Sequence, residues 1–104
     1  MAQFDVYPNP SPRSKVTMPY VVDVQSNLLS VLPTRLVIPL SRIGLNAPIA
    51  RNLVKQFTVD GESLFLLAHA AAPVDACSLQ GKVGSLHDAS HDVVVAMDVV
   101  LSGV

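Results

Sequence analysis

Residues 56–68, QFTVDGESLFLLA, carry the clearest local fold signal in the chain. Two runs rich in apolar and β-branched side chains, 56–59 and 62–68, flank the dipeptide Asp60-Gly61. An Asp-Gly pair supplies the positive φ angles that a tight two-residue turn between antiparallel strands requires. The stretch therefore predicts a β-hairpin.

Three further strands are predicted on the N-terminal side of this hairpin. Residues 3–7 alternate between polar and apolar side chains, and residues 20–25 (YVVDVQ) and 35–40 (RLVIPL) are rich in β-branched and apolar ones. Pro39 predicts that the third strand lies at an edge of the sheet or ends there, because proline cannot donate a ladder hydrogen bond. Residues 41–53 are predicted to form a long loop, and a helical turn at 48–53 is one option within it.

On the C-terminal side, the sequence predicts one short strand at 74–79 and a final helix. Apolar residues recur at helical spacing from residue 86, and Ser85 with Asp88 three residues later resembles a capping box. A helix that is apolar on several faces needs cover on more than one side. The order of elements predicts one mainly β domain, residues 1–104, in which an antiparallel sheet or open barrel carries a C-terminal helix at about 86–102.

The composition is unusually apolar for a chain of 104 residues, since half of the residues are hydrophobic and only 14% are charged. A domain of this size leaves roughly a third of its unfolded surface exposed, so the excess predicts a buried protein interface, most simply a homodimer. Cys77 is the only cysteine and is expected as a buried, small apolar side chain. Without a signal peptide, a disulfide or a long apolar run, the expected location is the cytoplasm, with no membrane contact.

Charge and motifs give little support to an enzyme. The net charge of −1 argues against a protein that grips nucleic acid by itself. No serine lies in a Gly-x-Ser-x-Gly turn, and no glycine-rich phosphate loop is present. His87 and His91 have a spacing that can bind zinc, but no third ligand is placed convincingly. We therefore expect no enzymatic activity, no cofactor and no metal.

One acidic residue of the predicted helix is out of place. Asp88 and Asp92 lie early in the helix and complement the positive end of its dipole, whereas Asp98 lies in the last turns, where the dipole is already negative. Two interpretations stay open. The residue belongs to a solvated polar face, or it marks a negative tip that docks on a cationic side chain of a partner.

Several stretches of the chain form a specific combination: MAQFDVY at 1–7, VVDVQSNLL at 21–29, TRLVIPL at 34–40 and a final helix ending in glycine plus a small aliphatic residue. In this combination the chain resembles the CcdB family, the toxins of plasmid and chromosomal toxin–antitoxin pairs. The similarity runs from residue 3 to residue 104, and it is looser over 41–85. It implies an SH3-like antiparallel barrel of the CcdB/MazF/Kid type, assembled as a homodimer without enzymatic activity.

The resemblance also implies a target and a regulator. Members of the family bind the gyrase A subunit and trap gyrase on cleaved DNA, so that breaks accumulate. A CcdA-like antitoxin wraps the toxin with a disordered segment and removes it from gyrase. The joint complex represses its own operon, and the antitoxin rather than the toxin contacts the DNA.

By matching position, the resemblance implies a gyrase-binding surface made of the helix end and a neighbouring patch. Its residues are Gln3, Phe4, Tyr7, Ser26, Leu28, Leu29, Asp98, Ser102, Gly103 and Val104. For Phe4 and Tyr7, burial in the core is the stronger expectation, whereas the Leu28-Leu29 pair is expected to be exposed. Arg13, Lys15, Arg42 and Arg51 lie in the loops 8–15 and 41–52 and are candidates for holding the antitoxin.

Ser102 departs from the family pattern, which often has a tryptophan at this position that stacks on an arginine of gyrase. The chain contains no tryptophan, and the loss of a cation–π stack removes roughly 0.5–2 kcal/mol of binding free energy. Asp98 replaces an amide, and a carboxylate pairing with the same arginine partly offsets the loss. We therefore expect gyrase binding with reduced potency.

Two other function classes stay open. Toxins of the MazF/Kid type share the barrel and cleave RNA sequence-specifically, which requires a basic cleft and an acid/base pair. Arg35, Arg42 and Asp23 are the candidates for that chemistry, although the near-neutral charge and the CcdB-like ends argue against it. The third possibility is a binding module that only occupies an antitoxin.

Overall fold

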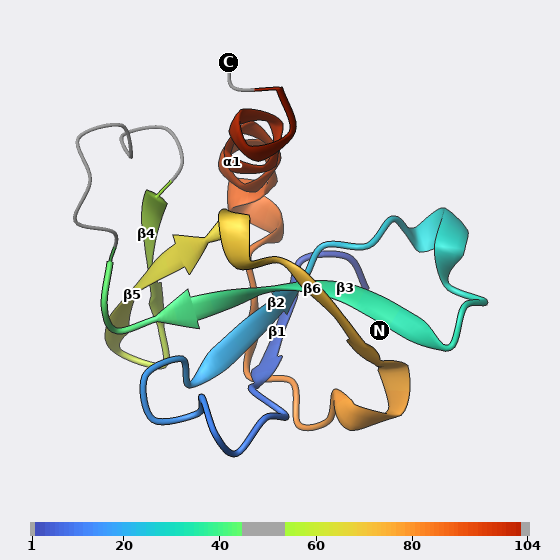
Figure 1. Cartoon of the computed structure of the whole chain (residues 1–104), viewed down its shortest axis with the longest axis horizontal. Coiled ribbons are helices and arrows are strands. Elements are labelled where there is room, and N and C mark those ends of the chain that lie inside the picture. The colour runs from blue at the N-terminus through green and yellow to red at the C-terminus, as the bar shows by residue number, and fades with distance from the viewer. Residues whose placement is uncertain (1, 45–53, 103–104) are drawn as a thin grey trace.

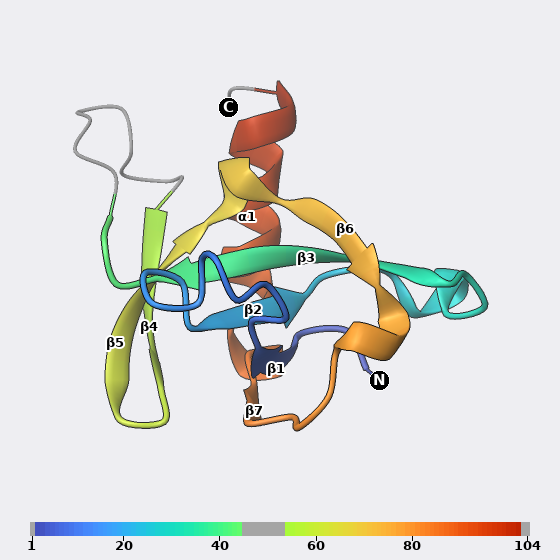
Figure 2. The same cartoon turned by 60° about the horizontal axis from the view of Figure 1, so that its bottom comes forward.

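A curled antiparallel sheet and a C-terminal helix make up the fold (Figures 1 and 2). This computed structural model describes residues 2–44 and 54–102. The strands are β1 (Asp5–Pro8), β2 (Tyr20–Asp23), β3 (Thr34–Ser41), β4 (Val54–Val59), β5 (Glu62–Leu67), β6 (Ala72–Asp75) and β7 (Gly84–Ser85). The helices are the short 3-10 turns η1 (Asn27–Leu29), η2 (Ala68–Ala70), η3 (Ala76–Ser78) and η4 (His87–Ala89) and the α-helix α1 (Ser90–Ser102). The predicted class, an antiparallel β fold with a C-terminal helix, is confirmed.

The hairpin of β4 and β5 has the predicted turn. Asp60 and Gly61 adopt φ angles of 52° and 80°, the left-handed values that a two-residue turn of this kind needs. Val59 and Glu62 therefore face each other directly, and the two strands stay in register down to the pair Val54 and Leu67.

Strand β3 is the centre of the sheet, which runs in the order β4-β5-β3-β2-β1-β7 with β6 as a second partner of β3. One side of β3 pairs with β2. The other side pairs with β6 over Thr34 to Val37 and with β5 at Leu40 and Ser41. The prediction that Pro39 marks an edge or an end is wrong. Pro39 lies between the two partner strands, where a missing N–H interrupts no ladder.

Two predicted strands are displaced. The first begins at Asp5 rather than residue 3, because Phe4 has a φ of 73° and cannot continue an extended strand. The strand predicted at 74–79 is β6, which starts at Ala72 and gives way to η3 after Asp75. The hydroxyl of Ser78 donates to the carbonyl of Asp75 at 2.6 Å and supports that turn.

The start of the terminal helix differs from the predicted capping box. The hydroxyl of Ser85 accepts a hydrogen bond from the N–H of His87 at 3.1 Å, two residues on, and not from residue 88. The chain then makes the 3-10 turn η4 before α1 begins at Ser90. The helical segment as a whole matches the prediction.

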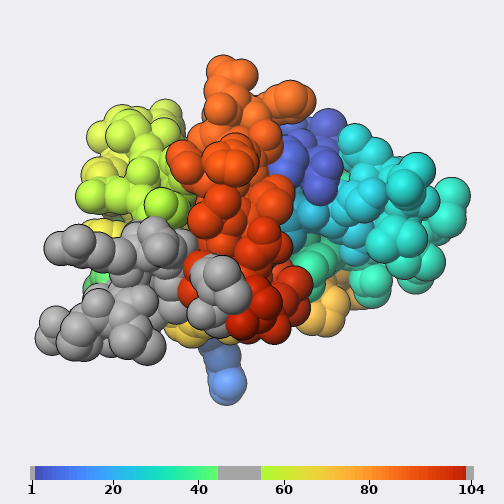
Figure 3. All heavy atoms as spheres, turned by 90° about the horizontal axis from the view of Figure 1, so that it is seen from above, coloured from blue at the N-terminus to red at the C-terminus, as the bar shows by residue number. Residues whose placement is uncertain are grey.

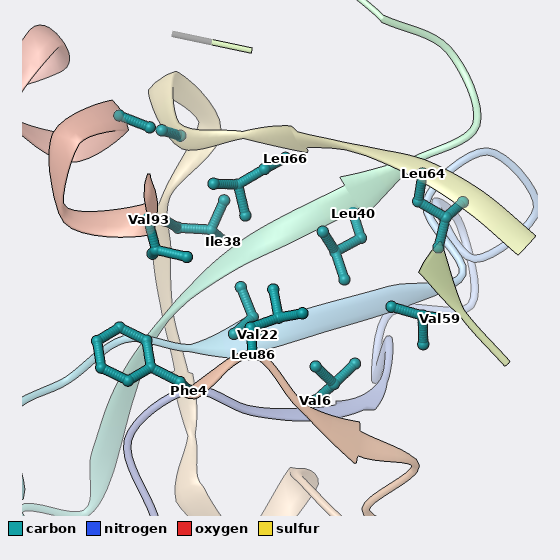
Figure 4. Packing of buried hydrophobic residues seen from close by; sticks show 12 residues of the cluster. Phe4, Val6, Val22, Ile38, Leu40, Val59, Leu64, Leu66, Leu86 and Val93 are labelled. Atoms are coloured by element: carbon teal, nitrogen blue, oxygen red, sulfur yellow. The ribbon is translucent and has the colours of Figure 1, made fainter. Parts of the chain in front are cut away.

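The main core fills the space between the sheet and α1 (Figure 4). Side chains alternate between the two faces of β1, β2 and β3, as the period of a strand requires. Val6, Val22, Ile38 and Leu40 pack in one buried cluster with Val93 of α1 and with Leu64 and Leu66 of β5. A smaller cluster occupies the opposite face and consists of Tyr7, Val21, Val37 and Leu79.

Much apolar surface remains outside these clusters. In α1 only Val93 and Ala96 are buried, while Leu101 at its end is 77% exposed. Cys77 in η3 is exposed, so the expectation of a buried thiol is wrong: η3 lies outside the sheet that carries the core. Among the described helices, none is both long and apolar enough to cross a membrane.

Candidate functional site

The chain between β2 and β3 carries the most exposed apolar side chains of the sheet region. We call residues 26–33 the leucine loop. All of its residues from 27 to 33 are exposed, with Leu28 at 90% and Leu29 at 48%. The hydroxyl of Ser26 caps η1 by accepting a hydrogen bond from the N–H of Leu28 at 3.2 Å. The predicted exposure of the leucine pair is confirmed.

Gln3 joins the N-terminal segment to this loop. Its backbone N–H donates to Oδ1 of Asn27 at 3.1 Å, and its side-chain Nε2 donates to the carbonyl of Val24 at 3.1 Å. Gln3, Ser26, Leu28 and Leu29, four of the predicted site residues, therefore lie on one patch.

Phe4 and Tyr7 are buried and do not belong to this patch, since they are only 8% and 5% exposed. The N–H of Phe4 donates to the carbonyl of Asp23 at 2.5 Å, and its ring meets His87 edge-on with the centroids 6.3 Å apart. The expected burial of both residues is confirmed. Within this chain they support neighbouring residues and offer little surface to a partner.

Ionisation of the Tyr7 hydroxyl is expected to destabilise the fold at alkaline pH. Burial raises the pKa of Tyr7 above its ordinary value, and the carboxylates of Asp5 and Asp23 raise that pKa further. The unfolded chain ionises Tyr7 near pH 10, so its stabilising effect is complete below about pH 10 and is lost as pH rises through the folded pKa. We expect urea unfolding to show this decline, and a smaller one in Tyr7→Phe. Equal declines in the two proteins would contradict the assignment.

The end of α1 presents polar groups to solvent. Asp98 and Ser102 are both exposed, and the Ser102 hydroxyl donates to the backbone carbonyl of Asp98 at 2.7 Å. Within residues 2–44 and 54–102 the Asp98 carboxylate forms no ion pair. The predicted contacts Gly103 and Val104 lie outside the described residues.

The two parts of the predicted surface are separate within one chain. Helix α1 packs mainly against η2, β4 and η4. The leucine loop projects to one side of the sheet, and η1 and the C-terminal end of α1 lie apart in both views of the ribbon (Figures 1 and 2). In the space-filling view, α1 lies on the surface between the β4–β5 hairpin and the segment that carries the leucine loop (Figure 3).

The basic candidates fall into two groups. Arg13 and Lys15 are exposed in the loop that connects β1 to β2. Arg42 is exposed as well, but its guanidinium pairs with Glu62 and also donates to the carbonyl of Val16. The hydrogen bond between the two side chains raises the pKa of Arg42 and lowers that of Glu62. Arg42 thus ties the β1–β2 loop to the hairpin, whereas Arg51 lies outside the described residues.

Asp23 and Arg35 form a buried ion pair. Both Nε and Nη2 of Arg35 lie 2.8 Å from Oδ2 of Asp23, and the two side chains are 2% and 0% exposed. These are two of the three residues that RNA cleavage would need at an open cleft. The sequence signal for the pair is one charged residue in each of two otherwise apolar strands. Where the chain is described, no group of three or more His, Cys, Asp or Glu side chains is placed to hold a metal ion.

One protein-family model, described as CcdB protein, matches residues 3–103, which is nearly the whole chain. The matched range includes the sheet, the leucine loop and α1. No curated protein matches the sequence.

Proposed function

The chain belongs to the CcdB family, and from this premise we propose that it is the toxin of a CcdA/CcdB-type pair that binds the gyrase A subunit and traps gyrase on cleaved DNA. The family match over residues 3–103 is the observation that carries the proposal. In this proposal the protein acts in the cytoplasm. It has no enzymatic activity of its own, because gyrase itself cuts the DNA and the toxin only traps the cleaved complex.

Two exposed features supply the proposed contact. Leu28 and Leu29 are apolar side chains held in water, and full burial of a leucine is favourable by about 1.5–3 kcal/mol. Asp98 places a negative charge on the last turns of α1, where an arginine of the partner would pair with it. Ser102, Gly103 and Val104 complete the helix tip in this proposal. Gln3 and Ser26 form the polar rim of the leucine pair.

A homodimer is part of the proposal. The leucine loop and the end of α1 lie apart in one chain, so a single copy offers gyrase two separate patches. The two-fold symmetry of a dimer would double both patches. Val94, Val100 and Leu101, which are exposed on α1, are candidates for the contact between copies.

The antitoxin is proposed to bind through the basic loops. Arg13 and Lys15 are exposed and form no ion pair within residues 2–44 and 54–102, and Arg51 remains a candidate. Arg42 contributes less, because Glu62 already occupies its guanidinium. In the joint complex the antitoxin contacts the operator DNA, and the toxin does not.

The RNA-cleaving alternative has less support. A general acid or base must reach its substrate, and Asp23 and Arg35 are enclosed by the sheet and neutralise each other. Arg42 alone does not form a basic cleft.

A cleavage assay tests the proposal. We expect purified protein, mixed with gyrase, supercoiled plasmid and ATP, to yield linear DNA after denaturation. Gly103→Glu and a variant lacking residues 102–104 are expected to yield none. Gln80→Glu introduces the same charge at an exposed position away from the helix tip and should act like the parent. Absence of linear DNA at micromolar concentrations of a folded parent would refute gyrase poisoning, and RNA cleavage would then be assayed.

A further inference from the structure

The leucine loop buries no side chain from residue 27 to residue 33, and hydrogen bonds to Asn27 and to the Pro33 carbonyl connect it to the rest of the chain. From residue 27 to residue 33 every side chain is exposed, and η1 contains no buried residue. Its internal backbone hydrogen bonds are local, such as the one from the Leu32 N–H to the Leu29 carbonyl at 3.1 Å. Packing therefore does not define the conformation that presents the leucines.

A single buried amide lies under this loop. The Nε2 group of Gln25 donates to the carbonyls of Leu29 at 3.1 Å and Thr34 at 2.9 Å, so it joins the end of η1 to the residue that follows the exposed segment. Its Oε1 accepts the N–H of Leu36 in β3 at 3.0 Å. Gln25 is only 9% exposed, and no buried side-chain polar atom of the described residues lacks a partner. An amide that uses both donor hydrogens and its oxygen in this way has one orientation.

The backbone of Gln25 is fixed in turn by the buried ion pair. Oδ1 of Asp23 accepts the Gln25 N–H at 3.1 Å, while Oδ2 of the same carboxylate binds Arg35 at 2.8 Å. Hydrogen bonds thus connect the interior of the sheet, through Asp23 and Gln25, to the carbonyl of Leu29, the residue that ends η1.

We propose that Gln25 is a positioning residue for partner binding, which acts by holding the leucine loop in the one conformation that presents Leu28 and Leu29. This inference rests on the proposed binding of gyrase. When the binding-competent conformation is populated only in part, the apparent dissociation constant rises by the same factor. Gln25→Ala removes both donors and is expected to weaken binding to the gyrase A subunit by about tenfold.

Asn9 provides a matched control. It is 8% exposed, and its amide donates to the Ser14 hydroxyl at 3.0 Å and the Met18 carbonyl at 2.8 Å, so it holds the β1–β2 loop as Gln25 holds the leucine loop. Asn9→Ala should lower stability in a similar way and leave gyrase affinity within about twofold of the parent. All affinities would be measured where each variant is fully folded by circular dichroism.

A double-mutant cycle separates positioning from a general loss of structure. If Gln25 acts through the leucines, Gln25→Ala should change affinity less than about twofold in a Leu28→Ala background, because the contact it positions is already lost. An equal loss in both backgrounds, or parental affinity of Gln25→Ala, would overturn the proposal.

Amide hydrogen exchange gives a result that does not depend on gyrase. Gln25→Ala should accelerate exchange of the Ser30 and Leu32 N–H groups, and Asn9→Ala should not. If the parent fails to bind the gyrase A subunit, the proposed function fails, and this measurement alone decides whether Gln25 orders the loop. Unchanged exchange in Gln25→Ala would refute the positioning role whatever the partner is.

Discussion

Replacement of Asp23 with alanine is expected to lower the free energy of unfolding by about 3–5 kcal/mol, because it leaves the Arg35 guanidinium buried without a counter-charge. The change also removes the acceptor for the Gln25 N–H. A domain of this size has a total stability of only about 5–15 kcal/mol, so the loss takes a large share of it. Urea unfolding followed by circular dichroism measures the change.

Two further variants distinguish a buried charge from a lost side chain. The double replacement Asp23→Leu with Arg35→Met removes both charges and keeps the volume filled, so it should be clearly more stable than Asp23→Ala. Glu62→Ala breaks an ion pair whose two side chains are 47% and 37% exposed, and its unfolding midpoint should stay near that of the parent. A double variant no more stable than Asp23→Ala would contradict this account.

Leu40→Ala is expected to lower the free energy of unfolding by about 2–5 kcal/mol. Leu40 is fully buried in β3, where it pairs with Tyr20 on one side and Leu66 on the other. Truncation removes apolar contact and leaves a cavity that the paired strands cannot close (Figure 4). Equilibrium unfolding in urea at neutral pH gives the value.

The same substitution at Leu28 is the control, because Leu28 is 90% exposed. Leu28→Ala should change stability by less than about 0.5 kcal/mol and still weaken gyrase binding. Comparison of Leu40→Ala with Leu28→Ala thus distinguishes an effect on folding from an effect on binding, because the chemical change is the same. A destabilisation at Leu28 as large as that at Leu40 would show that the leucine loop packs against something in solution.

The parts of the fold that depend on local chemistry were predictable from sequence. Asp60-Gly61 determines its turn through backbone angles alone, and the strand around Ile38 is evident from its β-branched and apolar residues. The terminal helix α1 was predictable in the same way from its apolar spacing, although the Ser85 hydroxyl accepts a different N–H from the one expected. Each of these signals depends only on residues that are close together in the sequence.

The predictions that failed depended on distant partners. From the sequence alone, Pro39 indicates an edge strand. In the structure β6 and β5 share one side of β3, and Pro39 lies in the gap between them. Cys77 is exposed because η3 lies off the sheet, and Phe4 turns left-handed where its N–H meets the carbonyl of Asp23. No local pattern encodes these contacts.

The candidate site divides in the same way. The exposure of Leu28 and Leu29 was predictable, since two leucines followed a strand in a connecting segment. The function of Gln25 was not, because the acceptors of its amide are brought to it only by the path of the loop. A glutamine at the end of an apolar strand carries no sign of whether its side chain faces water or a backbone carbonyl.

The leucine loop has a consequence for selectivity. Apolar surface gains free energy on contact with almost any other apolar surface, so Leu28 and Val31, each about nine-tenths exposed, attract unrelated proteins as readily as the intended one. A correct partner is distinguished by the polar groups that it must satisfy, since a wrong one would leave them dehydrated and unpaired. In the proposed interface, discrimination between targets would therefore fall to Gln3, Ser26 and Asn27 around the leucines, and the leucines themselves would supply adhesion.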